Sequence, residues 1–317
     1  MRQVLAIRTV VLLAVLLACV GAARAQFDAR FNQYWGVEGY YHPAWAGKTN
    51  ELRIQGAYSL QLTGFTHAPG SMYAGADVPF TLFGQKHGAG AGFFNESIGL
   101  FSNQRFWLQY AYQLKLGKGH LGIGVQVGML NSGFDPTDLE LPEEDNDEAF
   151  PATAESGMGL DLGAGLYYSH PKFFVALSGH HLTSPQLMLG DESYLNVKPA
   201  LYFTGGYNIK TRNPLLSIQP LCHVQTDLTS YRVDLTGRVL YTFRSRVLSG
   251  ALTYSPGTSV GASIGLKVGS LNFGYAYEMY TSAIGAESGT HELMVGYSLD
   301  LSKFKKSRNL HKSIRIL

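Results

Sequence analysis

Residues 104–130 alternate between apolar and polar side chains in two consecutive stretches, and this period constrains the fold more than any other feature. In residues 105–116 one face reads Phe, Leu, Tyr, Tyr, Leu, Leu, and the other reads Arg, Trp, Gln, Ala, Gln, Lys. The alternation resumes in residues 121–129 after a Gly-Lys-Gly turn. Because successive side chains of a strand point to opposite faces, the pattern predicts a β-hairpin with one apolar and one polar face.

The composition of the polar face indicates which side is the core. That face is mainly Gly, Gln, Ser, Thr and Ala, with few of the Lys and Glu residues that a water-exposed surface carries. Charged residues make up only 15% of the chain, against an average of roughly 25%. A barrel with apolar residues toward lipid and a polar lumen accounts for both faces. We therefore expect an all-β fold, a transmembrane antiparallel β-barrel.

The same two-residue period recurs through residues 51–302 and predicts about fourteen strands. Two odd-numbered connections, at 131–156 and 182–197, are the longest, whereas the even-numbered ones are tight except near 81–87. Short periplasmic turns and long external loops are typical of outer-membrane barrels, and an even strand number puts both termini in the periplasm. The strands are expected near 51–60, 71–80, 88–95, 104–116, 120–130, 157–169, 172–181, 198–209, 214–225, 230–243, 246–254, 258–268, 270–280 and 290–301.

Charged residues in the later strands give a further expectation. A charge facing lipid at the bilayer midplane would cost roughly 2–4 kcal/mol, so these side chains should face the lumen and pair across neighbouring strands. They are Arg232, Asp234, Arg238 and Glu278. No segment of the mature chain approaches the ~18–20 consecutive apolar residues of a membrane-spanning helix.

The first residues read as an export signal. Residues 1–25 combine a basic start, an apolar stretch and the cleavage site Ala23-Arg24-Ala25, which is typical of a signal peptide. The alternative is lipidation at Cys19, because Leu16-Leu17-Ala18-Cys19 also reads as a lipobox. The other cysteine, Cys222, has no partner in the mature chain, so no disulfide framework is predicted.

Two segments flank the predicted barrel. Residues 26–50 are rich in aromatic side chains and have no clean period, so we expect an irregular segment folded against or inside the barrel's periplasmic end. Residues 303–317 carry six Lys or Arg residues and are expected to form a basic periplasmic tail.

Few residues suggest chemistry. His180 and His181 lie at the end of a predicted strand, where adjacent rings point to opposite faces and cannot readily share a metal, so a structural role is expected. Residues 88–92 alternate Gly and Ala, like a strand whose small face lets the barrel interior fill or bend. No spacing selects a catalytic triad or a phosphate loop, so no catalytic residue, cofactor or metal site is predicted. The net charge of +2 gives no indication of a nucleic-acid partner.

An acidic run occupies the connection after the fifth predicted strand. High carboxylate density suits Ca²⁺, whose ligands are hard oxygens, but the spacing of an EF-hand is absent. We expect a solvated, mobile loop, with a cation site or a partner contact as the alternatives. The carboxylates are Asp135, Asp138, Glu140, Glu143, Glu144, Asp145, Asp147 and Glu148.

Both ends of the mature chain resemble a known family. Phe31-Asn32-Gln33-Tyr34 and His42-Pro43-Ala44-Trp45-Ala46-Gly47 are similar to the F-x-Q-Y … N-P-A-x-A-G opening of the PorP/SprF family of type IX secretion system membrane proteins. His42 stands where the family usually has Asn, and Thr253 to Gly257 lacks a common Y-R pair. Further matching stretches are 67–70, 88–92, 95–99, 110–112, 275–278 and Gly289-Thr290-His291-Glu292-Leu293.

The resemblance implies an outer-membrane barrel of the type IX secretion and gliding machinery, which assists secretion or surface anchoring of a partner protein. The implied partners are outer-membrane lipid, a periplasmic OmpA-like peptidoglycan-binding lipoprotein, and a secreted surface adhesin or other secretion-system subunits. An outer-membrane channel or hydrophobic-solute transporter is the alternative, since fourteen strands enclose a lumen. Candidate partner contacts are Phe31, Gln33, Tyr34, His42, Pro43, Trp45 and Gly47 toward the periplasm, and Asp135, Glu143, Glu144, Asp145 and Asp147 toward cargo.

Overall fold

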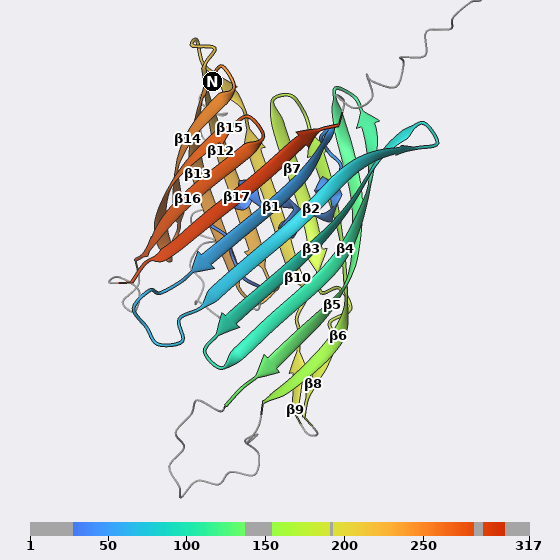
Figure 1. Cartoon of the computed structure of the whole chain (residues 1–317), viewed down its shortest axis with the longest axis vertical. Coiled ribbons are helices and arrows are strands. Elements are labelled where there is room, and N and C mark those ends of the chain that lie inside the picture. Colours follow the sequence, from blue (N-terminus) through green and yellow to red (C-terminus); the bar gives the residue numbers. More distant parts are fainter. Residues whose placement is uncertain (1–27, 137–153, 191–192, 282–287, 302–317) are drawn as a thin grey trace, which may run out of the picture.

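The strands close into one antiparallel barrel (Figure 1). The computed structural model describes residues 28–136, 154–190, 193–281 and 288–301. Neighbouring strands follow the sequence order, and β1 (Glu51–Leu60) pairs with β17 (Thr290–Asp300) to complete the circle of fourteen. The other wall strands are β2 (Gly70–Leu82), β3 (Gln85–Ile98), β4 (Phe101–Leu116), β5 (Gly119–Phe134), β6 (Glu155–Ser169), β7 (Phe173–His180), β10 (Ala200–Tyr207), β12 (Leu216–Thr226), β13 (Tyr231–Phe243), β14 (Arg246–Ser255), β15 (Ser259–Val268) and β16 (Leu271–Tyr280).

All fourteen predicted strands are confirmed, and the structure adds detail that the period does not contain. The short strand β11 (Ile209–Lys210) prolongs β10 beyond Asn208 and pairs with β12. No helix among the residues described has both the length and the apolar character needed to cross a bilayer.

Side chains along the strands separate by face as the alternation predicts. On β4 and β5, Leu108 and Val125 point outward and are 54% and 53% exposed. Arg105 and Gln109 of β4 point into the lumen and are buried. Apolar rows facing outward and polar rows facing inward are the pattern of a barrel solvated by lipid.

The charged residues of the later strands face the lumen, as expected. Asp234 and Glu278 are buried there, and Arg232 connects them: its Nε lies 2.9 Å from Asp234 Oδ1 and its Nη2 lies 2.7 Å from Glu278 Oε1. Arg232, Asp234 and Glu278 therefore meet opposite charges of the wall instead of lipid. The pairing expected for Arg238 is not found among the described residues, where its Nη1 bonds the amide oxygen of Gln219 at 3.3 Å.

The two ends of the barrel differ. At one end, called here the short-turn end, tight turns join β2 to β3, β4 to β5, β6 to β7, β13 to β14 and β15 to β16. The prediction of a longer connection near 81–87 is wrong: Phe83 and Gly84 form a two-residue turn, both with positive φ (50° and 76°). The opposite end, the long-loop end, carries the connections that follow β1, β5, β7 and β16.

A small hairpin lies within the long connection after β7, and the period did not predict it. Its strands β8 (Gln186–Leu189) and β9 (Ser193–Asn196) pair only with each other. Leu187 is fully buried and packs with Leu130 and Val197. A Cβ added at Gly157 of β6 would lie 2.4 Å from the Met188 carbonyl oxygen, so the hairpin lies against the glycine face of β6.

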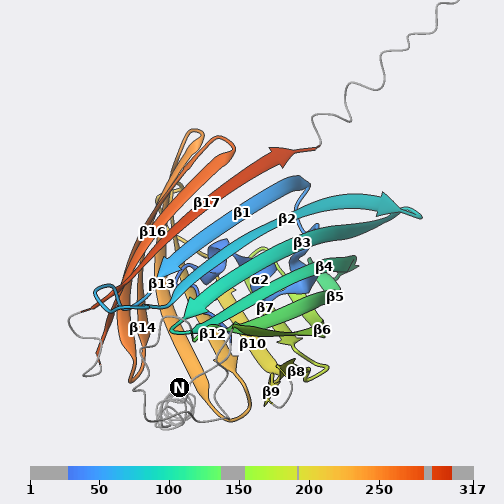
Figure 2. The same cartoon turned by 60° about the horizontal axis from the view of Figure 1, so that its bottom comes forward.

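The N-terminal segment lies within the barrel (Figure 2). We call residues 28–50 the plug; it contains η1 (Tyr34–Gly36), α2 (Glu38–Tyr41) and η2 (Pro43–Trp45). Its first residue, Asp28, contacts His181 just beyond β7 at the long-loop end. Its last, Asn50, accepts a hydrogen bond from Leu301 at the short-turn end. Whereas the sequence places this segment at one end, the described residues run along the whole lumen.

Candidate functional site: the lumen and its plug

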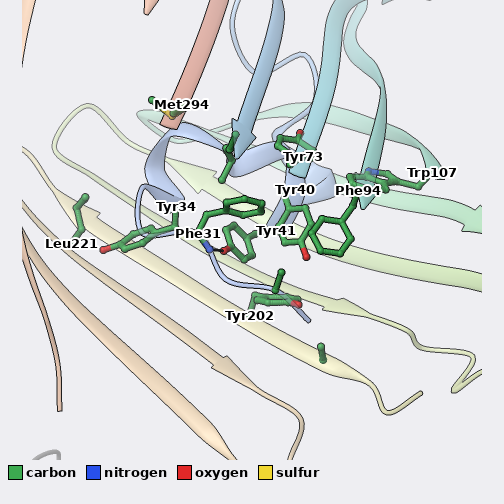
Figure 3. Packing of buried hydrophobic residues seen from close by; sticks show 14 residues of the cluster. Phe31, Tyr34, Tyr40, Tyr41, Tyr73, Phe94, Trp107, Tyr202, Leu221 and Met294 are labelled. Carbon is green, nitrogen blue, oxygen red and sulfur yellow. Dashed lines mark hydrogen bonds between the residues drawn. The ribbon is translucent and has the colours of Figure 1, made fainter. Parts of the chain in front are cut away.

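The centre of the plug is a cluster of aromatic rings (Figure 3). Phe31, Tyr34, Tyr40 and Tyr41 are each at most 1% exposed. Tyr40 meets the ring of Tyr73 on β2 at a centroid distance of 5.4 Å, and further contacts reach Phe94, Trp107 and Tyr202 on the wall. Full burial of one such ring contributes roughly 1.5–3 kcal/mol, so the cluster ties the plug to both sides of the barrel.

The two stretches that carry the family resemblance meet in the lumen. Glu292, in the Gly-Thr-His-Glu-Leu stretch of β17, accepts hydrogen bonds from the backbone N–H groups of Asn32 (2.5 Å) and Gln33 (2.8 Å). The next residue, Tyr34, donates its hydroxyl to Thr236 on β13 at 3.0 Å. A buried carboxylate that satisfies two backbone donors fixes the position of the plug relative to the last strand.

His42, the position that departs from the family pattern, anchors the plug to β7 and β10. Ser178 donates its hydroxyl to the Tyr41 carbonyl (2.6 Å), so it accepts from His42 Nδ1 (2.8 Å). His42 Nε2 is then the acceptor for the Thr204 hydroxyl at 2.7 Å. Thr204 in turn accepts from Nδ1 of His223 at 2.8 Å. Both ring nitrogens of His42 therefore have partners when the imidazole is neutral, the state that burial of the ring favours.

The stretch after His42 lies directly on the glycine faces of β3 and β5. Gln113 of β4 donates its Nε2 to the carbonyl oxygens of Ala44 (3.0 Å) and Ala46 (2.8 Å). A Cβ added at Gly88 would lie only 2.1 Å from the Ala46 oxygen, and one at Gly124 would lie 2.2 Å from the Ala44 nitrogen. Gly88, the first residue of the small face predicted for residues 88–92, is thus where the plug packs, whereas Gly90 and Gly92 leave room for Gln109 and Trp107 of the wall.

Near the short-turn end, Lys48 attaches the plug to the wall strand β6. Its Nζ lies 3.7 Å from the ring centroid of Trp45 and 4.2 Å from that of Tyr167 on β6, and it donates to the Tyr167 hydroxyl at 3.1 Å. The neighbouring Gly47 donates its N–H to Asp77 at 2.9 Å. A cation over two aromatic faces contributes roughly 0.5–2 kcal/mol or more when it is desolvated.

Ion pairs hold the other end of the plug, and the sequence did not predict them. Arg30 pairs with Glu278, and Asp28 lies 3.0 Å from Nε2 of His181, whose Nδ1 lies 3.0 Å from Asp161. The sequence predicted that charged strand residues face the lumen. No pattern in the sequence predicted that some of their partners are residues 28–30.

The histidine pair also differs from expectation. His180 and His181 both point into the lumen, with ring centroids 6.3 Å apart, because His181 has a positive φ of 53° just after β7 ends. Alternation therefore no longer applies to it. His180 lies 3.2 Å from Arg105, and no group of three or more His, Cys, Asp or Glu residues suited to a metal occurs in the described part of the chain.

The structure describes the candidate partner contacts of the plug, but only one of those in the acidic run. Asp135 is exposed just after β5 and donates its N–H to the Leu100 carbonyl at 3.0 Å, whereas Glu143, Glu144, Asp145 and Asp147 lie outside the described residues. Those in the plug contact the barrel wall or other plug residues, and all seven are buried: Phe31, Gln33, Tyr34, His42, Pro43, Trp45 and Gly47.

The fold and the filled lumen define an outer-membrane type of β-barrel membrane protein. A family model described as type IX secretion system membrane protein PorP/SprF matches residues 23–297. The chain therefore belongs to the PorP/SprF family, and it is a membrane component of the type IX secretion system. The comparison with curated proteins gave no match.

Solved barrels resemble the chain in fold alone. The toluene transporter TodX of Pseudomonas putida is 9% identical over 86% of this chain and 95% of its own, with a TM-score of 0.51. The CymD monoaromatic hydrocarbon channel is 11% identical over 86% and 94%, with a TM-score of 0.48. The outer membrane protein Omp33 of Acinetobacter baumannii is 8% identical over 80% and 100%, with a TM-score of 0.46.

Proposed function

We propose that this protein is a closed outer-membrane barrel that assists secretion or surface anchoring of a partner protein through its two ends, without conducting solutes through its lumen. The observation that carries the proposal is the plug, which fills the lumen with buried aromatic rings and is fixed at both ends by charged contacts. A lumen occupied in this way leaves the rims as the surfaces on which partners bind.

The short-turn end is proposed to face the periplasm, as in outer-membrane barrels whose short turns lie on that side. There the basic tail, residues 303–317, would bind a periplasmic OmpA-like peptidoglycan-binding lipoprotein. The long-loop end, with the acidic run 135–148, would face a secreted adhesin or another secretion-system subunit. Export through a signal peptide, residues 1–25, belongs to the same proposal. The signal peptide, the basic tail and the acidic run from residue 137 onward lie outside the described residues.

Cross-linking and co-purification from native membranes test this proposal. A photoreactive residue at Lys118, in the exposed β4–β5 turn, samples the short-turn end, and one at Leu228 samples the long-loop end. We expect a peptidoglycan-binding protein at the first position and a secretion substrate or subunit at the second. Recovery of neither class at either position would contradict the proposal.

The alternative, a channel or hydrophobic-solute transporter, receives less support. TodX and CymD are described as transporter and channel, but the likeness to them is one of fold at low identity. Planar-bilayer recordings separate the two functions: a closed barrel gives no steady current, whereas steady open-channel current from the intact protein would favour transport.

A further inference from the structure

An open space lies in the lumen at the short-turn end. It has a volume of about 260 Å³ and lies between the last residues of the plug and the strands β13 to β17 and β1. Much of its lining is only partly buried, so water and solutes can enter. The lining side chains are mainly polar or charged, among them Glu51, Arg53, Gln55, Arg238, Lys267 and Asn272.

Three cations line this cavity, and they are incompletely paired. Arg53 is more than nine-tenths buried; its Nη2 pairs with Asp77 at 2.7 Å, but its Nε has no hydrogen-bond partner. Arg238 likewise has a buried Nε without a partner, and its Nη1 reaches only the amide oxygen of Gln219, at 3.3 Å. In the part of the chain that the structure describes, no carboxylate lies within 4.0 Å of Lys267 or Arg238.

Three carboxylates lie near these three cations, but none of the described carboxylates forms a close ion pair with Arg238 or Lys267. Glu51 lines the cavity, and Glu38 of the plug interacts electrostatically with Arg53, Arg238 and Lys48. Asp77 is already bonded to Arg53 and to the Gly47 backbone. The Nε atoms of Arg53 and Arg238 are buried away from the open space, but an anionic group entering the cavity would gain charge-assisted hydrogen bonds from the parts of Arg238 and Lys267 that line it.

We propose that this cavity binds a carboxylate side chain of an acidic peptide segment that approaches from the short-turn end. The inference rests on the proposed function, because it makes the peptide part of a periplasmic partner. The volume is below the roughly 300–1,000 Å³ of sites that enclose a drug-sized ligand, so one or two side chains enter while the rest of the peptide stays outside. Arg238 and Lys267 bind the carboxylate, and the amides of Gln55 and Asn272 are placed to bond the peptide backbone.

Binding of fluorescein-labelled hexaglutamate to the detergent-purified full-length protein, followed by fluorescence anisotropy, tests the site. The double variant Arg238→Gln/Lys267→Gln should weaken binding by about tenfold or more, because two charge-assisted contacts are lost. The matched control is Lys118→Gln, which removes a cation from the exposed β4–β5 turn at the same end and should change affinity by less than about twofold. Heat-modifiable migration on gels verifies that each variant remains a folded barrel.

Three results would overturn the site. They are absence of hexaglutamate binding to the wild-type protein, equal weakening by Lys118→Gln, and unchanged affinity in the folded double variant. A hexaglutamate complex displaced by inorganic phosphate at matched concentration would also overturn it, since the site would then select charge and not a peptide carboxylate. Because these measurements use purified protein and a synthetic peptide, their failure leaves the cross-linking test of the proposed function unaffected.

Discussion

At the scale of single residues, a few lumen side chains decide where the plug lies. Glu292 satisfies two backbone donors of the plug, and His42 bridges Ser178 and Thr204. Gly88 acts by having no side chain, since any Cβ would meet the Ala46 carbonyl. Buried polar groups without partners cost free energy, so each of these residues matters through what its loss leaves unpaired or displaced.

Replacing Glu292 should loosen the plug. Glu292→Ala leaves two buried N–H groups without acceptors, and we expect the free energy of unfolding to fall by about 2–4 kcal/mol. Urea titration in detergent micelles, followed by tryptophan fluorescence, measures the change, because Trp35 and Trp45 lie in the plug. The control Glu155→Ala, at the first residue of β6, should have little effect; equal losses in both variants would contradict the role assigned to Glu292.

Adding one methyl group at the plug contact should also destabilise the protein. Gly88→Ala puts a Cβ 2.1 Å from the Ala46 oxygen, so backbone must shift, at a cost of about 1–3 kcal/mol. Gly237→Ala on β13 is the matched control, since nothing lies within 4 Å of its added Cβ. The same urea titration compares the two, and a Gly88→Ala protein as stable as the control would argue against tight packing there.

At the scale of elements, the plug and the wall depend on each other. The strands supply glycine faces on β3, β5 and β6, and the plug and the β8–β9 hairpin lie against them. The plug is too small to have a core of its own: η1, α2 and η2 together have ten residues, and its rings are buried against one another and against wall residues. The plug is therefore ordered by the barrel that surrounds it.

Removing the plug should open the lumen. Deletion of residues 29–46 takes away the rings of the central cluster that come from the plug, and we expect steady ionic currents in planar bilayers that the intact protein lacks. Heat-modifiable migration identifies preparations in which the barrel still forms, and only these are recorded. A folded deletion variant without current would mean that the wall itself closes the lumen.

At the scale of the whole molecule, the outer surface is a continuous apolar band. Side chains that would be internal in a water-soluble sandwich, such as Leu108, Val125 and Ile264, are half or more exposed. β4 and β5 each have 16 residues, more than the roughly 9–11 that a tilted strand needs to cross a bilayer, so both extend beyond it.

A charge on this band should oppose insertion. Leu108→Arg, near the middle of β4, should cost about 2–4 kcal/mol for folding into lipid vesicles, because the guanidinium would face hydrocarbon. Leu228→Arg, in the β12–β13 turn, introduces the same residue at a position that is 73% exposed and should be nearly neutral. Folding yield against urea concentration measures both, and equal yields would contradict a lipid-facing Leu108.

The sequence by itself determined the strands, their number and the face that meets lipid. These features follow from a two-residue alternation, which depends only on neighbouring residues along the chain. The sequence also indicated that Asp234 and Glu278 face the lumen, since a charge in lipid is costly. Only the tertiary structure decided that residues 28–50 run the length of the barrel, that His181 turns inward after β7, and that Glu292 meets Asn32 and Gln33. These contacts join residues up to 260 positions apart and depend on how a closed wall encloses an irregular segment, which no local pattern specifies.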